Sequence, residues 1–252
     1  MPERVDLRVL GALRLRDGVT GAAIRRRLRV GAPGLTLRQN RDGLHVIYGA
    51  LGLEAHRTAF EAPPAAPAPG SLDFDLSIED PDGIYLPARA SLALPRGFDP
   101  EGGLRDLVIP VEIDLARSAG MLVPRNWAAL AVMVRDQAGA PLRGALVELR
   151  PQGGGDRMSW GLTNAHGEAV LAVPGLPLMR VVENDPGTDE DDEIISAETP
   201  VELTAVADPA RPWPVDPAVL AAGGPGLRTA GPQAMTLAPG RTDNAELSLD
   251  LG

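Results

Sequence analysis

The sequence predicts an all-β protein built from two tandem antiparallel β-sandwich domains. Short apolar stretches alternate with polar residues at a period of two, and 29 Gly and 25 Pro among 252 residues separate these stretches as turn signals. Several of the turn signals also recur in one order along the chain. This length is a prior for about two domains. With 3% aromatic residues, each core must be aliphatic.

The expected strands follow from the alternation, because each alternating stretch would bury one face and leave the other in water. A nearly continuous apolar run, Trp127–Val134, is expected to begin the second domain. One short helix is expected at Pro217–Ala222, since Asp216 can cap it and Pro is favoured in the first turn. A single helical turn near Gly120 is the other candidate. The alternating stretches are Val5–Val9, Leu13–Arg16, Leu72–Ile78, Val111–Leu115 and Ala245–Leu251.

The recurring turn signals indicate a duplicated domain. Asp and Asn can bond their own backbone, Gly can take positive φ, and Pro ends a strand, so each signal has a physical role in a turn. The repeat pairs Asp17 with Asp136 at an offset of 119, Asn40 with Asn164 at 124, and Asp80-Pro81 with Asp208-Pro209 at 128. A fourth pairing sets residues 86–89 against residues 237–241.

The predicted domains cover residues 1–120 and 121–252. The first has a basic N-terminal part, and the second carries an acidic insertion at residues 183–193. A proline-rich stretch at residues 62–70 is expected to connect strands of the first domain as an extended segment.

Part of the second domain resembles a known family. Residues 134–149 read as a strand, an Asp-x-x-Gly-x-Pro turn, a bend of small residues and a second strand, and residues 161–169 read as a Thr-Asn-x-x-Gly hairpin. This pattern resembles the carboxypeptidase-regulatory-like family, whose fold is a transthyretin-like relative of the immunoglobulin sandwich. The resemblance implies two immunoglobulin-like or transthyretin-like domains that stabilise, space or bind without catalysis.

The layout also resembles small two-domain accessory proteins that are encoded with phage-tail-like contractile injection particles. The stretch Glu79–Arg89 and the Asn-x-x-Gly hairpins carry this second resemblance. It implies a structural or accessory role whose partners are the other protein subunits of such a particle.

Composition restricts the chemistry and the location. The absence of Cys excludes disulfides, thiolate metal sites and a cysteine nucleophile. No stretch reaches the roughly 18 apolar residues of a membrane span, and the charged N-terminus does not read as a secretory signal. We therefore expect synthesis in the cytoplasm without a signal peptide. Incorporation into a phage-like particle is one possible destination of the protein.

The charge is distributed unevenly. Residues 1–60 hold 11 Arg and 5 acidic residues, a net charge of +6, whereas the remainder holds 13 Arg and 29 acidic residues, a net charge of −16. The densest basic stretch reads as a strand with no aromatic residue between its arginines, which favours a protein contact over nucleic acid. Its candidate interaction residues are Arg25, Arg26, Arg27 and Arg29.

Two further features are candidates for interaction. The acidic run Asp189, Glu190, Asp191, Asp192 and Glu193 reads as a solvated loop, with a docking surface for a basic partner and a Ca²⁺ site as alternatives. Trp213 lies between two prolines and is a candidate interface anchor, whereas Trp127 and Trp160 are expected in the core.

No pattern in the sequence predicts catalysis. The three histidines, His45, His56 and His166, have no nucleophile or orienting acid at a recognisable spacing, and no phosphate-binding loop is present. We therefore expect no enzyme, no cofactor and no catalytic or metal residues. The expected function is a non-catalytic structural or accessory component of a large assembly. The alternative is a monomeric module that binds carbohydrate or Ca²⁺.

Overall fold

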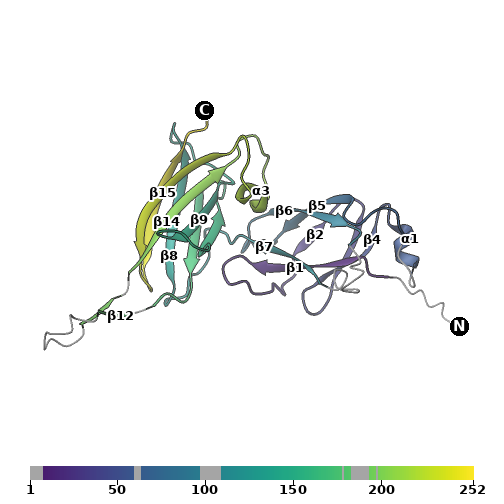
Figure 1. The fold of residues 1–252 in the computed structure, drawn as a ribbon, viewed down its shortest axis with the longest axis horizontal. Coiled ribbons are helices and arrows are strands. Elements are labelled where there is room, and N and C mark those ends of the chain that lie inside the picture. The colour runs from purple at the N-terminus through teal and green to yellow at the C-terminus, as the bar shows by residue number, and fades with distance from the viewer. Residues whose placement is uncertain (1–7, 60–63, 97–108, 178, 183–192, 197) are drawn as a thin grey trace. The chain divides into compact units, whose positions relative to one another are not determined.

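The computed structural model describes residues 8–59, 64–96, 109–177, 179–182, 193–196 and 198–252 (Figure 1). This part of the chain is nearly all β and sandwich-like, which confirms the predicted fold class at that level. The chain divides into two compact units: residues 1–17 and 21–115 form unit 1, and residues 18–20 and 116–252 form unit 2.

Unit 1 has a four-stranded sheet in the order β3-β4-β1-β7 and a three-stranded sheet in the order β2-β5-β6. Leu13 and Ile47 from the first sheet and Leu76 and Leu92 from the second meet in one core. The elements are β1 (Gly11–Asp17), β2 (Arg29–Gly31), β3 (Leu35–Gln39), β4 (His45–Ala50), α1 (Glu54–Thr58), β5 (Leu72–Glu79), β6 (Ala88–Leu94) and β7 (Val111–Leu115).

Unit 2 has a three-stranded sheet, β11-β8-β16, and a four-stranded sheet, β10-β9-β14-β15. The two sheets share one aliphatic core. The hairpin of β12 and β13 is a separate two-stranded sheet. The elements are β8 (Ala128–Asp136), β9 (Leu146–Pro151), β10 (Ser159–Leu162), β11 (Glu168–Val173), β12 (Met179–Val182), β13 (Glu193–Ser196), β14 (Thr199–Ala207), α3 (Pro217–Ala221), β15 (Arg228–Leu237) and β16 (Thr242–Leu249).

The two units share one pairing scheme. β1 is antiparallel to β4 and parallel to β7, as β8 is antiparallel to β11 and parallel to β16. In the opposite sheets, β5 lies between β2 and β6, as β14 lies between β9 and β15. The third strand differs, since β3 pairs with β4 whereas β10 pairs with β9.

The parallel pairs correct the prediction of purely antiparallel sandwiches. Successive strands of each unit reverse direction, so that strands an odd number of steps apart run antiparallel. The first and the last strands of each unit are six steps apart in unit 1 and eight steps apart in unit 2. They therefore run in the same direction, and their pairing is parallel.

The predicted Asn turns have the same hydrogen bonds in both units, whereas the Asp turns differ by one residue. Gly21 N donates to Asp17 O, four residues earlier, at 2.8 Å, and Gly139 N donates to Asp136 O, three residues earlier, at 3.0 Å. Asn Oδ1 accepts from the backbone N–H groups two and four residues later, at 2.9 and 2.9 Å for Asn40 and at 2.8 and 3.1 Å for Asn164. These Asx turns fix the hairpins at equivalent positions.

The fourth sequence pairing is wrong. Residues 86–89 lead into β6, which pairs with β5, whereas residues 237–241 lead into β16, which pairs with β8 in the other kind of sheet. The topological counterpart of β6 is β15. Both stretches combine Pro with a following alternation, and this local pattern does not specify the sheet.

Of the two short helices in the described residues, the sequence predicted one. Its other candidate, near Gly120, is a turn and not a helix, with Met121 N donating to Ser118 O at 3.1 Å. The helix α3 begins where expected, because the Asp216 carboxylate accepts from Ala218 N at 2.8 Å. The five-residue α1 was not predicted, since it is too short for a helical periodicity and its first turn has no side-chain cap.

Gly167 is expected to tolerate substitution poorly. Its φ is +74°, and an added Cβ would lie 2.5 Å from Val134 O. Gly139 has a φ of +84° with open space around it, so Gly139→Ala should cost only about 1 kcal/mol of unfolding free energy. We expect Gly167→Ala to cost at least about 1 kcal/mol more.

Urea denaturation followed by tryptophan fluorescence measures this difference, because Trp127, Trp160 and Trp213 all belong to unit 2. Equal losses of stability in the two variants would contradict the close approach of β8 to the turn at Gly167.

Candidate functional site

The arginine-rich stretch is not a strand, which corrects the prediction. Residues 25–28 have no regular structure, and Arg29 begins β2. Ile24 and Leu28 are buried in the core, and they bring this stretch across from one sheet of unit 1 to the other. Arg25 and Arg27 are exposed between these anchors.

Two of the four predicted arginines pair with carboxylates of the same unit. Arg26 forms ion pairs with Asp80, at 3.6 Å from Nη2 to Oδ1, and with Asp82. Arg29 Nη1 lies 3.9 Å from Glu79 Oε2. These arginines therefore have intramolecular partners.

Asp80 also has intramolecular partners for its carboxylate. Its side chain is 0% exposed, and its oxygens accept from the backbone N–H groups of Asp82, Ile84 and Tyr85 at 3.0 to 3.1 Å. With Arg26 beside it, this carboxylate has the donors that stabilise a buried negative charge.

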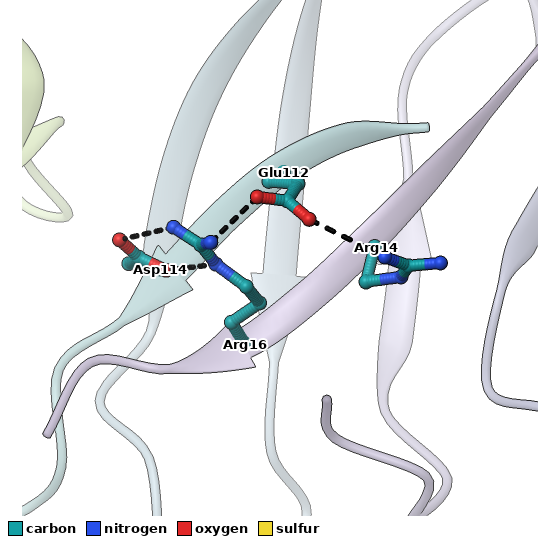
Figure 2. Close-up of polar contacts among 4 residues, drawn as sticks. All are labelled: Arg14, Arg16, Glu112 and Asp114. Carbon is teal, nitrogen blue, oxygen red and sulfur yellow. Dashed lines mark hydrogen bonds and ion pairs between the residues drawn. The ribbon is translucent and has the colours of Figure 1, made fainter. Parts of the chain in front are cut away.

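A second charged cluster lies across the parallel pair β1–β7 (Figure 2). Arg16 holds Asp114 through two bonds, Nε–Oδ1 at 2.7 Å and Nη2–Oδ2 at 3.0 Å, and reaches Glu112 Oε2 at 2.5 Å. Arg14 Nη1 lies 3.4 Å from Glu112 Oε1. The four side chains are 31% to 41% exposed. The hydrogen bond from Arg16 to Asp114 raises the pKa of Arg16.

These ion pairs reduce the effective charge difference between the basic residues 1–60 and the rest of the chain. Arg14, Arg16 and Arg26 belong to the basic N-terminal stretch, and their acidic partners come from residues 80–114 of the same unit. Much of the positive charge of residues 1–60 is therefore compensated inside unit 1.

Trp213 is half-buried in the loop before α3. Its ring lies against Gly144, where an added Cβ would be 3.2 Å from Cε3, and the Arg143 guanidinium lies over the ring at 4.3 Å from its centroid. A cation–π contact of this kind stabilises the loop. The role of Trp213 as an interface anchor stays a prediction.

The acidic run lies mostly outside the described residues. Asp189, Glu190, Asp191 and Asp192 belong to residues 183–192, and Glu193 begins β13, where its backbone pairs with Val182. Among the described residues, no group of acidic or histidine side chains could hold a metal ion.

Sequence reasoning missed two buried carboxylates. Asp17, 3% exposed, accepts from the Tyr85 hydroxyl at 2.8 Å, and Glu148, 8% exposed, accepts from Arg157 Nη1 at 2.7 Å. Arg157 also lies over the Trp160 ring at 5.2 Å from its centroid. The alternation of β1 places Asp17 on the buried face, so the sequence could have indicated its burial. No local pattern indicates that Glu148 is buried.

The three histidines lie on different elements. His45 is buried in β4, His56 is buried in α1, and His166 is exposed in the hairpin turn before β11. No helix in the described residues is long and apolar enough to cross a membrane.

Comparisons with known proteins identify no family for this chain. No family model matches the chain, and no curated protein matches it. Among solved structures, the chain aligns with a streptococcal ancillary pilin at 10% identity and a TM-score of 0.26, over 86% of this chain and 49% of the pilin chain. The chain thus spans about half the length of that pilin, and a TM-score this low carries no argument.

The charged cluster on β1 and β7 should contribute modestly to stability. In a double-mutant cycle of Arg16→Gln and Asp114→Asn, we expect a coupling of about 0.5 to 1 kcal/mol, because both groups are partly exposed. Urea denaturation followed by circular dichroism measures the cycle at 50 mM and 1 M NaCl. A coupling that does not fall at high salt would contradict an exposed ion pair.

Unit 1 should lose stability below about pH 6.5. Burial lowers the pKa of His45 and of His56, and the nearby Arg8 lowers the pKa of His56 further. The unfolded chain, whose histidines titrate near about 6.5, therefore takes up protons first as the pH falls. The loss is at most about 1.4 kcal/mol per pH unit for each histidine.

Hydrogen exchange of unit 1 peptides at pH 7.5 and 5.5, corrected for intrinsic rates, measures this loss. The variant carrying His45→Gln and His56→Gln should lose the pH dependence. An unchanged dependence in this variant would show that other groups cause it.

Proposed function

We propose that this chain is a non-catalytic structural component of a large protein assembly, and that each unit is an immunoglobulin-like β-sandwich. The common pairing scheme of the two units supports the tandem arrangement. The resemblance of residues 79–89 to accessory proteins of contractile injection particles supports a phage-tail-like particle as the assembly.

The observation that carries the proposal is the open edge at β6. Within the described residues, β6 pairs with β5 on one side and with no strand on the other. It is seven residues long, contains neither Gly nor Pro, and holds Leu92 and Leu94 in the core. Such an edge can extend the sheet of a neighbouring subunit by strand addition.

The test is sedimentation of particles from the cells that make the chain, with quantification by mass spectrometry. We expect the chain to sediment with other subunits at a fixed ratio. Ser91→Lys, which places a charge on the open edge, should lower the sedimenting fraction at least about fivefold. Ser77→Lys, on the same outer face but on the central strand β5, is the matched control and should keep its share.

A chain recovered alone at monomer mass would contradict the proposal. In that case, retention on polysaccharide or a rise in melting temperature with Ca²⁺ would favour the binding module instead.

A further inference from the structure

Five exposed arginines of unit 1 make no ion pair with any residue that the structure describes, and four of them lie on two neighbouring segments. The fifth is Arg89 on β6. Arg25 and Arg27 flank the paired Arg26, Arg38 lies on the edge strand β3, and Arg41 lies in the turn that follows β3. We call these four residues the arginine patch.

The two segments that carry the patch are in contact. The Gln39 side chain donates from Nε2 to Arg26 O at 3.0 Å. At Gly43, an added Cβ would lie 3.0 Å from Arg25 Cα and 2.8 Å from Ile24 O. The backbone of residues 24–26 therefore runs beside that of residues 39–43, and all four arginines lie on these two segments or one residue from them.

The patch is unusual in a chain with a net charge of −10. Other arginines of the unit, such as Arg14, Arg16 and Arg26, have acidic partners. Residues 24–27 and 38–43 contain a single acidic residue, Asp42. Four positive charges on two adjacent segments, with a single acidic residue beside them, favour an anionic partner.

We propose that the arginine patch binds the acidic segment 183–193 of a second copy of this chain. The segment holds seven carboxylates, at positions 183, 185, 189, 190, 191, 192 and 193, and no basic residue. Carboxylates match the fork of the guanidinium group, which binds them through two hydrogen bonds. The inference rests on the proposed structural function, because it makes the chain a repeating subunit.

The partner is a protein segment rather than nucleic acid. The patch segments contain no aromatic residue on which a base could stack, and the negative charge of the whole chain opposes a polyanion. The contact joins unit 1 of one copy to unit 2 of the next, so it is heterologous and can continue from copy to copy.

The test is a charge swap on the purified full-length chain, followed by sedimentation velocity over a range of concentrations at 50 mM and 500 mM NaCl. The wild type should associate at low salt, with an apparent association constant at least about tenfold lower at high salt. The patch variant carries Glu at positions 25, 27, 38 and 41, and the segment variant carries Arg at positions 189–192. Each variant alone should stay monomeric, whereas an equimolar mixture should associate.

A control replaces the exposed Arg125 and Arg228, which lie outside the patch and outside β6, with Glu. This control should associate like the wild type, and circular dichroism should show that every variant is folded.

Several results would overturn the inference. A wild type that is monomeric at every concentration would exclude the contact between copies. The inference would then be wrong even if the segment binds the patch of its own chain. Failure of the mixture to associate would exclude the pairing of these two regions. Patch-dependent binding of a labelled 20-nucleotide duplex by a monomeric wild type would assign the patch to nucleic acid. Any of these results leaves the proposed function standing if the chain still sediments with particles.

Discussion

In each unit the first strand pairs in parallel with the last strand, and the interior position of that first strand depends on this closure. Leu13 pairs with Val111 in unit 1, and Val132 pairs with Ala245 in unit 2, so the ladders join residues about a hundred positions apart. The closure places β1 and β8 inside their sheets, with strands on both sides. Their inward side chains, such as Leu15 and Leu130, are consequently 0% exposed.

Features that the sequence predicted are local. The Asx turns at Asn40 and Asn164 depend on a side chain that bonds amides two and four residues later, so four or five residues specify them. The alternation of β1 likewise specifies which of its residues are buried. The cap at Asp216 predicted α3 for the same reason.

Features that the sequence did not predict depend on residues far apart. Arg16 and Asp114 meet only because the register of β1 and β7 brings them together, and no pattern near either residue indicates the other. Arg26 and Asp82 are likewise far apart in the sequence. The sequence therefore predicted a uniformly basic stretch, although the charge of Arg26 is compensated by Asp82. The sequence also did not predict which sheet a strand joins. The repeat that matched residues 86–89 with residues 237–241 was wrong for this reason.

Hydrogen exchange of the full-length chain tests the closure most directly. Because a closing strand opens only when its unit unfolds, the amides of β7 and β16 that donate to β1 and β8 should be protected as strongly as the hydrogen-bonded amides of β1 and β8. The account predicts that these hydrogen-bonded amides of each closing pair exchange with one common free energy of opening, equal to that for global unfolding of the unit. Rapid exchange in β16 with full protection retained in β8, β9 and β14 would contradict the account, because the last strand would then be a dispensable edge.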